Sequence, residues 1–155
     1  MAIPLIGFSD FKRLLDADDY VLNVLTTLRV CLPDAYVAAG FVRNRVWDSF
    51  YDQADLYPDL DIDVIYFDQG DKSPETDYVL EESLRTLMNV PWQVRNQARM
   101  HEFGGHNPFC SIEDALEHWP ETATAIGVRL TEESCFEFIA PFGFNDLLSH
   151  TLRIT

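Results

Sequence analysis

The sequence predicts a single α/β or α+β domain in which helices flank a mixed β-sheet. Apolar runs of strand length and amphipathic runs of helix length interleave along the chain without strict alternation. Residues 126–130 and 135–140, separated by Thr-Glu-Glu-Ser, have the pattern of an antiparallel hairpin. The length of 155 residues suits one domain, and no repeat or linker divides it. We therefore expect one domain over residues 1–155.

The amino-terminal part of the chain predicts helices before the first strand. Ser9 can cap a short helix and Asp19 begins a second one, which gives a helical segment at about residues 9–32. Beyond this segment, the apolar spacing predicts a buried strand, a helix and a loop, at residues 35–39, 41–50 and 55–59 respectively.

The clearest strand signal is the run of β-branched and aromatic residues 61–67. Ser73 followed by Pro74 indicates a helix start, because proline suits the first helical position. Ser111 and Asp114 resemble a capping box at the start of another helix. The other expected elements are a strand at 92–97, a loop at 104–108, the end of the Ser111 helix at Trp119 and a closing helix at 145–151.

The composition is strongly acidic, since 26 Asp and Glu against 11 Lys and Arg give a formal charge of −15. Hydrophobic residues make up 47% of the chain, so this acidity does not indicate disorder. Proteins that coat nucleic acids neutralise phosphates with surplus Lys and Arg, and anionic membranes attract basic surfaces. We therefore expect neither duplex nucleic acid nor a membrane as a partner, and a nucleotide would arrive as a small molecule with a metal ion.

The chain shows no pattern of a signal peptide and no run of roughly 18 apolar residues that could span a membrane. Cys31, Cys110 and Cys135 are far apart and form no Cys-x-x-Cys, which excludes a zinc knuckle and a redox motif. These features predict a cytoplasmic protein and leave its oligomeric state open.

The strongest chemical signal is the sequence Asp61-Ile62-Asp63 at the start of a predicted strand. Side chains alternate along a strand, so the two carboxylates leave on the same face, with Cα atoms roughly 6.5–7 Å apart. Such a pair suits a hard divalent ion such as Mg²⁺, which prefers oxygen ligands and bridges to phosphates. The alternative is an ordinary acidic strand start that faces water.

A second signal lies where the predicted strand at 35–39 turns into a helix. Gly40 would let backbone amides approach a phosphate, helped by the helix dipole. Arg43 and Asn44 would lie on the same side of the helix, and Arg43 could hold a phosphate through two hydrogen bonds. The alternative is a tight turn followed by a helix surface.

The order of a strand, a glycine-led helix and a strand with Asp-x-Asp resembles the nucleotidyltransferase fold of the DNA polymerase β superfamily. The chain is most similar to a bacterial family described as nucleotidyltransferase-like or as a domain of unknown function. The similarity spans residues 32 to about 148 and is carried by runs 39–44 (Ala-Gly-Phe-Val-Arg-Asn), 61–68 (Asp-Ile-Asp-Val-Ile-Tyr-Phe-Asp), 96–101 (Asn-Gln-Ala-Arg-Met-His), 119–125 (Trp-Pro-Glu-Thr-Ala-Thr-Ala) and 139–143 (Ile-Ala-Pro-Phe-Gly).

This resemblance implies transfer of a nucleoside monophosphate from an NTP to an acceptor hydroxyl, with Mg²⁺ or Mn²⁺ as cofactor. Superfamily members hold two metal ions with three carboxylates. Asp61 and Asp63 match the first two carboxylates, and Gly40 matches the glycine of the phosphate-binding turn. Phe41 stands where the superfamily usually has Ser or Gly.

The third carboxylate is expected at residue 93, where this chain has glutamine. Gln93 can accept a hydrogen bond or ligate a metal weakly, but it cannot act as a general base. Glu137, which alternates with Phe136 and Phe138 on a predicted strand, is the available substitute catalytic acid. The alternative for Glu137 is a surface position on the hairpin.

Arginines are scarce in this acidic chain, which makes two of them candidates for binding a triphosphate or an anionic acceptor. Arg95 and Arg99 share one alternation face with Gln97 if the strand at 92–97 extends that far. The alternative is that both arginines form salt bridges with the many carboxylates.

Two functions follow from the sequence. The first is a metal-dependent nucleotidyltransferase acting on an unidentified hydroxyl acceptor. The second is a nucleotide- or metal-binding module that has lost turnover and acts as a sensor or partner-binding protein, which Gln93 and Phe41 favour. A sugar-nucleotide glycosyltransferase is disfavoured, because the chain is short for one and Asp-x-Asp precedes most of the fold.

Overall fold

The computed structural model of the chain describes residues 8–38, 40–44, 61–148 and 153–154. The predicted loop at 55–59, most of the predicted helix at 41–50 and part of the predicted closing helix lie outside the described residues. Within them, residues 40–44 are helical. The other elements are α1 (Phe8–Asp16), α2 (Asp19–Cys31), β1 (Tyr36–Ala38), β2 (Ile62–Tyr66), α4 (Pro74–Leu87), β3 (Trp92–Asn96), α5 (His101–Gly104), α6 (Ile112–Leu116), β4 (Gly127–Leu130), β5 (Phe136–Ile139) and α7 (Asn145–Leu148).

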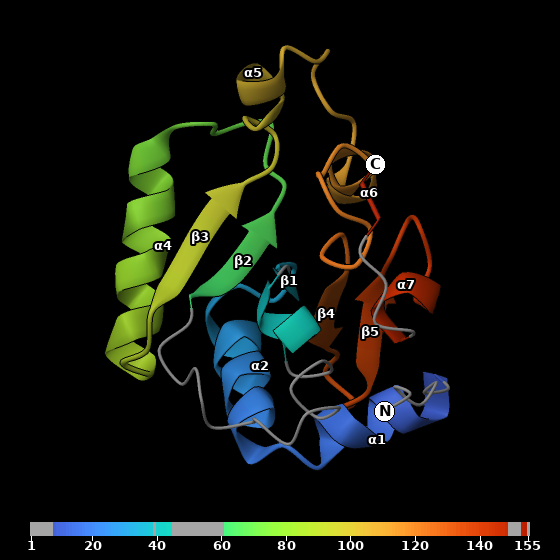
Figure 1. Cartoon of the computed structure of the whole chain (residues 1–155). Helices are drawn as coiled ribbons and strands as arrows, with labels where there is room; N and C mark the ends of the chain where they lie inside the picture. Colours follow the sequence, from blue (N-terminus) through green and yellow to red (C-terminus); the bar gives the residue numbers. More distant parts are fainter. Residues whose placement is uncertain (1–7, 39, 45–60, 149–152, 155) are drawn as a thin grey trace.

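The described strands form one mixed sheet in the order β3-β2-β1-β4-β5. β2 and β3 are parallel and are joined through α4, whereas β1 is antiparallel to both β2 and β4 (Figure 1). β4 and β5 form the antiparallel hairpin that the sequence predicts. The mixed sheet with flanking helices confirms the predicted fold class.

One face of the sheet carries the main hydrophobic core, because α2 and α4 pack against it. Val37, Val64 and Val94 point into this core from neighbouring strands and are fully buried. Val24, Leu28 and Leu84 meet them from the two helices. Burial of an aliphatic side chain contributes about 1.5–3 kcal/mol, so this layer holds the strands in place.

The predicted helix starts at Asp19, Ser73 and Ser111 are confirmed. Asp18 caps α2 by accepting a hydrogen bond from the Val21 amide at 3.2 Å. Ser111 caps α6 by accepting one from the Asp114 amide at 3.0 Å. None of the described helices is long and apolar enough to cross a membrane.

The predicted strand at 92–97 is one residue shorter in the structure, because Asn96 ends it. The Asn96 side chain is fully buried, and its Oδ1 accepts hydrogen bonds from the amides of Asp68 and Ala98, both at 3.0 Å. Residues 97–100 therefore form a turn, and the short helix α5 follows where the sequence predicted no helix.

The opposite face of the sheet is covered only in part. Leu116 of α6 and Trp119 pack there against Tyr36, Ala38 and Ile65. Towards β3 the same face carries Asp63 rather than an apolar side chain, and this is where the candidate site lies.

Candidate active site

The two predicted metal ligands lie at the start of β2. Asp61 immediately precedes the strand and is exposed, whereas Asp63 is half-buried within it. Asp63 lies directly opposite Ala38 of β1 and Gln93 of β3. Residues that lie opposite each other in a sheet share a face, so Asp63 and Gln93 project from the same side of the neighbouring strands β2 and β3.

The charge of this pair is poorly compensated. Burial and the negative charge of Asp61 raise the pKa of the Asp63 carboxyl to about 6, and the positive charge of Arg95 opposes this shift only in part. Among the described residues, no third His, Cys, Asp or Glu joins the two carboxylates. Two repelling carboxylates in a half-buried place fit a single hard divalent cation.

Gln93 occupies the position where the sequence led us to expect a third acid. Its Nε2 donates a hydrogen bond to Oδ2 of Asp61 at 2.7 Å. The amide therefore solvates one carboxylate of the pair without adding charge to the site.

The predicted phosphate turn lies at the end of β1, on the other side of β2 from Gln93. A Cβ atom added to Gly40 would lie 3.6 Å from Nη2 of Arg43 and 4.0 Å from Nδ2 of Asn44. Both side chains therefore fold back over Gly40, and the structure brings all three predicted residues together. Since a Cβ would make only ordinary contacts, the fold itself does not demand glycine here.

Glu121 also lies in this region, although its sequence context predicts no role for it. Nη1 of Arg43 donates to Oε2 of Glu121 at 3.1 Å, and Nε of Arg43 donates to Oδ1 of Asn44 at 3.2 Å. Glu121 and Trp119 belong to the run 119–125, whose sequence is distinctive but has no spacing typical of a chemical motif. Only the tertiary structure brings this run to the site.

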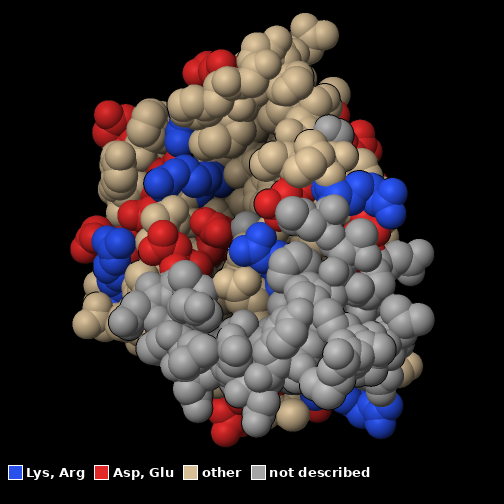
Figure 2. All heavy atoms as spheres, in the orientation of Figure 1, with Lys and Arg blue, Asp and Glu red and all other residues tan. Residues whose placement is uncertain are grey.

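A cavity of about 380 Å³ opens beside Asp63 on the β3 side of the sheet face. Figure 2 shows charged side chains gathered around a hollow in the middle of this face, with uncharged surface above it in the region of α5. The cavity is lined by Asp63, Val64, Ile65, Gln93, Arg95, Gln97, Met100, Phe103 and Trp119.

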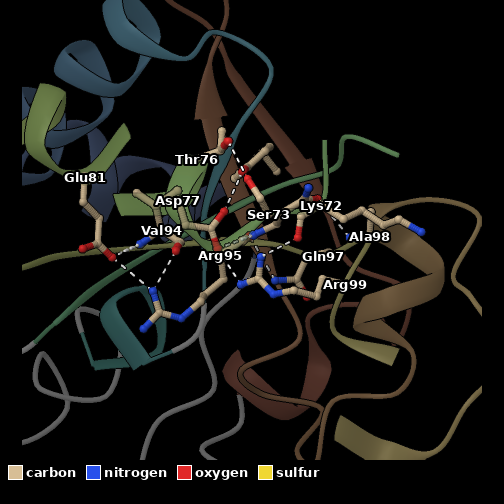
Figure 3. A network of polar contacts seen from close by, with 12 residues as sticks. Lys72, Ser73, Thr76, Asp77, Glu81, Val94, Arg95, Gln97, Ala98 and Arg99 are labelled. Atoms are coloured by element: carbon tan, nitrogen blue, oxygen red, sulfur yellow. Dashed lines mark hydrogen bonds and ion pairs between the residues drawn. The ribbon is translucent and has the colours of Figure 1, made fainter. Parts of the chain in front are cut away.

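The two arginines predicted to bind an anion have different surroundings (Figure 3). Arg95 lines the cavity, although its Nη1 also donates to Oε1 of Glu81 at 3.1 Å. Arg99 instead forms an ion pair with the buried Asp77, at 2.6 Å between Nη2 and Oδ2, and donates from Nη1 to the Lys72 carbonyl. The predicted shared face fails because the strand ends at Asn96, before Arg99.

Glu137, the predicted substitute for the third acid, is not brought to the pair. It lies on β5 and accepts a hydrogen bond from Nη2 of Arg129 at 2.8 Å. β1 and β4 stand between β5 and β2. Three strand spacings separate Glu137 from Asp63, which is about 14 Å.

The mixed sheet with its flanking helices has the fold of a nucleotidyltransferase head domain, and the acid pair and Gly40 lie at neighbouring strand ends of this sheet. The chain is similar to a protein whose NMR structure is described as revealing a CCA-adding enzyme head domain, with a TM-score of 0.83 and 34% sequence identity. The match covers 96% of this chain and 79% of that chain.

Residues 26–155 match a protein family described as nucleotidyltransferase. The chain therefore belongs to this nucleotidyltransferase family, which confirms the resemblance found in the sequence. Comparison with curated proteins gives no match.

Proposed function

We propose that the protein transfers a nucleoside monophosphate from an NTP to a hydroxyl acceptor, with Mg²⁺ or Mn²⁺ held by Asp61 and Asp63. The observation that carries this proposal is the acid pair with its half-buried Asp63, in which burial and the negative charge of Asp61 raise the pKa of Asp63 to about 6. When bound, the metal supplies positive charge to the phosphates and thereby stabilises the charge of the transition state.

The phosphates of the NTP would lie against Gly40, Arg43 and Asn44. A Cβ atom built on Gly40 would lie at van der Waals distance from the Arg43 guanidinium and the Asn44 amide, so both groups border the space above Gly40. When a phosphate binds there, Arg43 would leave its ion pair with Glu121 and donate a charge-assisted hydrogen bond to a phosphate oxygen. The absence of a side chain at Gly40 keeps that space open.

Gln93 takes the place of an acid and would hydrogen-bond the acceptor hydroxyl or a metal-bound group through its amide. It cannot remove the hydroxyl proton, so positioning and charge neutralisation would supply most of the rate. This arrangement also favours the second candidate function, in which the site binds nucleotide and metal without turnover.

Substitution of one acid by its amide tests the proposal. We expect Asp63→Asn to abolish Mg²⁺-dependent binding of a non-hydrolysable ATP analogue, measured by calorimetry, and to abolish pyrophosphate release in an acceptor screen. Glu113→Gln, on the exposed start of α6, is the matched control and should change neither.

The outcomes separate the two functions. Retained binding and transfer by the Asp63→Asn protein would contradict the proposed site. Metal-dependent binding by the natural protein without pyrophosphate release, over a broad range of acceptors, would favour the binding module.

A further inference from the structure

The cavity beside Asp63 is lined by both apolar and polar side chains. Ile65, Met100, Phe103 and Trp119 supply hydrophobic and aromatic surface, and Gln93, Arg95 and Gln97 supply polar groups. Phe103 lies on α5 with 79% of its surface exposed, which is unusual for a large aromatic side chain. A volume of about 380 Å³ lies within the range of small-molecule sites and is too small for a folded macromolecule.

The Trp119 side of the cavity is held in position. Nε1 of Trp119 donates a hydrogen bond to Oε1 of Gln97 at 3.3 Å, and Gln97 is itself 3% exposed. The Trp119 ring is thereby fixed before any ligand binds, so a flat ring could stack there at little entropic cost.

The strand order places the phosphate turn and the β3 residues of the cavity on opposite sides of Asp63. β1, which leads into Gly40, pairs with one edge of β2, and β3, which carries Gln93 and Arg95, pairs with the other. In phosphoryl transfer the attacking oxygen and the leaving group lie roughly in line through the phosphorus atom. If the pyrophosphate leaves on the Gly40 side, the acceptor oxygen must approach from the side of the cavity.

We propose that this cavity binds the acceptor, and that the acceptor is a small alcohol with a planar ring. The inference rests on the proposed function. The ring stacks against Trp119 and Phe103, and the hydroxyl points towards Gln93 and Asp63. In the transfer step the hydroxyl oxygen forms a bond to the α-phosphorus, and its proton passes to water. The bond from the α-phosphorus to the bridging oxygen breaks, and pyrophosphate leaves with that electron pair.

The charge of the protein supports a small acceptor over an RNA end. Glu81 and Glu121 lie next to the two arginines nearest the site, and the whole chain has a formal charge of −15. A polyanion would be repelled along its length, whereas a small alcohol needs only the local surface of the cavity.

Binding of model alcohols tests the inference. The probes are 2-phenylethanol and 2-naphthylmethanol, with cyclohexylmethanol as the non-planar control and the α,β-methylene analogue of ATP with Mg²⁺ as the nucleotide. We expect the aromatic alcohols to bind together with the nucleotide, as followed by calorimetry and NMR titration, and more tightly than the control. Phe103→Ala should weaken their binding about tenfold and leave nucleotide binding within twofold.

Phe142→Ala is the matched control, because Phe142 is also exposed but does not line the cavity. Competition between the aromatic alcohols and the nucleotide, with weaker nucleotide binding in Phe103→Ala, would mean that the cavity holds the nucleobase and would overturn the inference. Failure of both aromatic alcohols to bind would overturn it too. If the proposed function itself is wrong, the natural protein will not bind the Mg²⁺-nucleotide at all. This result is distinct from those that overturn only the inference about the acceptor.

Discussion

Two groups of acidic residues on neighbouring parts of the fold have opposite surroundings. Asp77 and Glu81 of α4 are only 1% and 6% exposed, yet each has a full set of partners. Asp61 and Asp63 are less buried, yet among the described residues the hydrogen bond to this pair comes from the uncharged Gln93, which donates to Asp61.

The partners of the α4 acids explain the difference. Glu81 accepts a hydrogen bond from the Val94 amide and forms an ion pair with Arg95, and Asp77 pairs with Arg99. Asp77 also accepts the hydroxyl hydrogen of Tyr66, and burial together with this contact raises the pKa of Tyr66. The charges of these buried acids are compensated within the fold, whereas a repelling pair whose charge is compensated only in part is suited to an added cation.

Removal of the arginine from the α4 group should have the largest effect on stability. Arg99→Ala leaves the buried Asp77 without its counter-charge, and we expect a loss of about 3 kcal/mol in the free energy of unfolding, measured with urea. Nucleotide binding by the folded protein should be retained. Unchanged stability together with lost nucleotide binding would instead show that Arg99 binds phosphate, as the sequence predicted.

Removal of the Asp63 charge should instead raise the free energy of unfolding. The folded protein raises the pKa of Asp63 from 3.8 to about 6, so stability that is present below pH 3.8 is lost as the pH rises through 6. In EDTA we expect Asp63→Asn to be more stable than the natural protein by about 1–2 kcal/mol at pH 8, after allowance for solvent screening.

This gain should shrink towards zero below pH 4, where Asp63 is neutral in both the folded and the unfolded state. Urea denaturation over the pH range checks the prediction. A variant that is equally destabilised at every pH would indicate that the carboxylate of Asp63 has a structural partner like those of Asp77 and Glu81.

Substitution of Glu137, the predicted third acid, should have the smallest effect on stability and on nucleotide binding. Glu137 pairs with Arg129 at the far edge of the sheet, and 43% of its side chain is exposed. Glu137→Gln should cost about 0.5 kcal/mol in stability and leave Mg²⁺-nucleotide binding unchanged. Lost nucleotide binding in this variant, measured by calorimetry, would place Glu137 at the site despite its distance.

These comparisons show which parts of the site the sequence could predict. The placement of Asp61 next to Asp63 could be predicted because residues two apart on an extended chain share a face, and that of Gly40 because a glycine follows an apolar strand. The position of Glu137 relative to Asp63 could not be predicted, because alternation gives the face on which a side chain lies but not the order of the strands in the sheet. Sequence alone also could not pair Arg43 with Glu121, which lies 78 positions further along the chain.

The fold was more predictable than the contacts, and for a physical reason. Hydrophobic periodicity reports burial of whole elements, so β2, the start of α4 and the β4–β5 hairpin were predicted close to their observed positions. The turn after β3 depends on one buried side chain, that of Asn96, which bonds to residues about 25 positions away. Such a contact leaves no periodic signal.

The acidic side chains of α4 have one more effect, which concerns the association of this protein with itself. β3 is an edge strand, and an edge strand normally offers unpaired amides to which a second chain can add a strand. Here the carboxylates of Glu81 and Asp77 accept the outward amides of Val94 and Asn96. The sheet is closed on this side by side chains, and edge-to-edge aggregation through β3 is blocked.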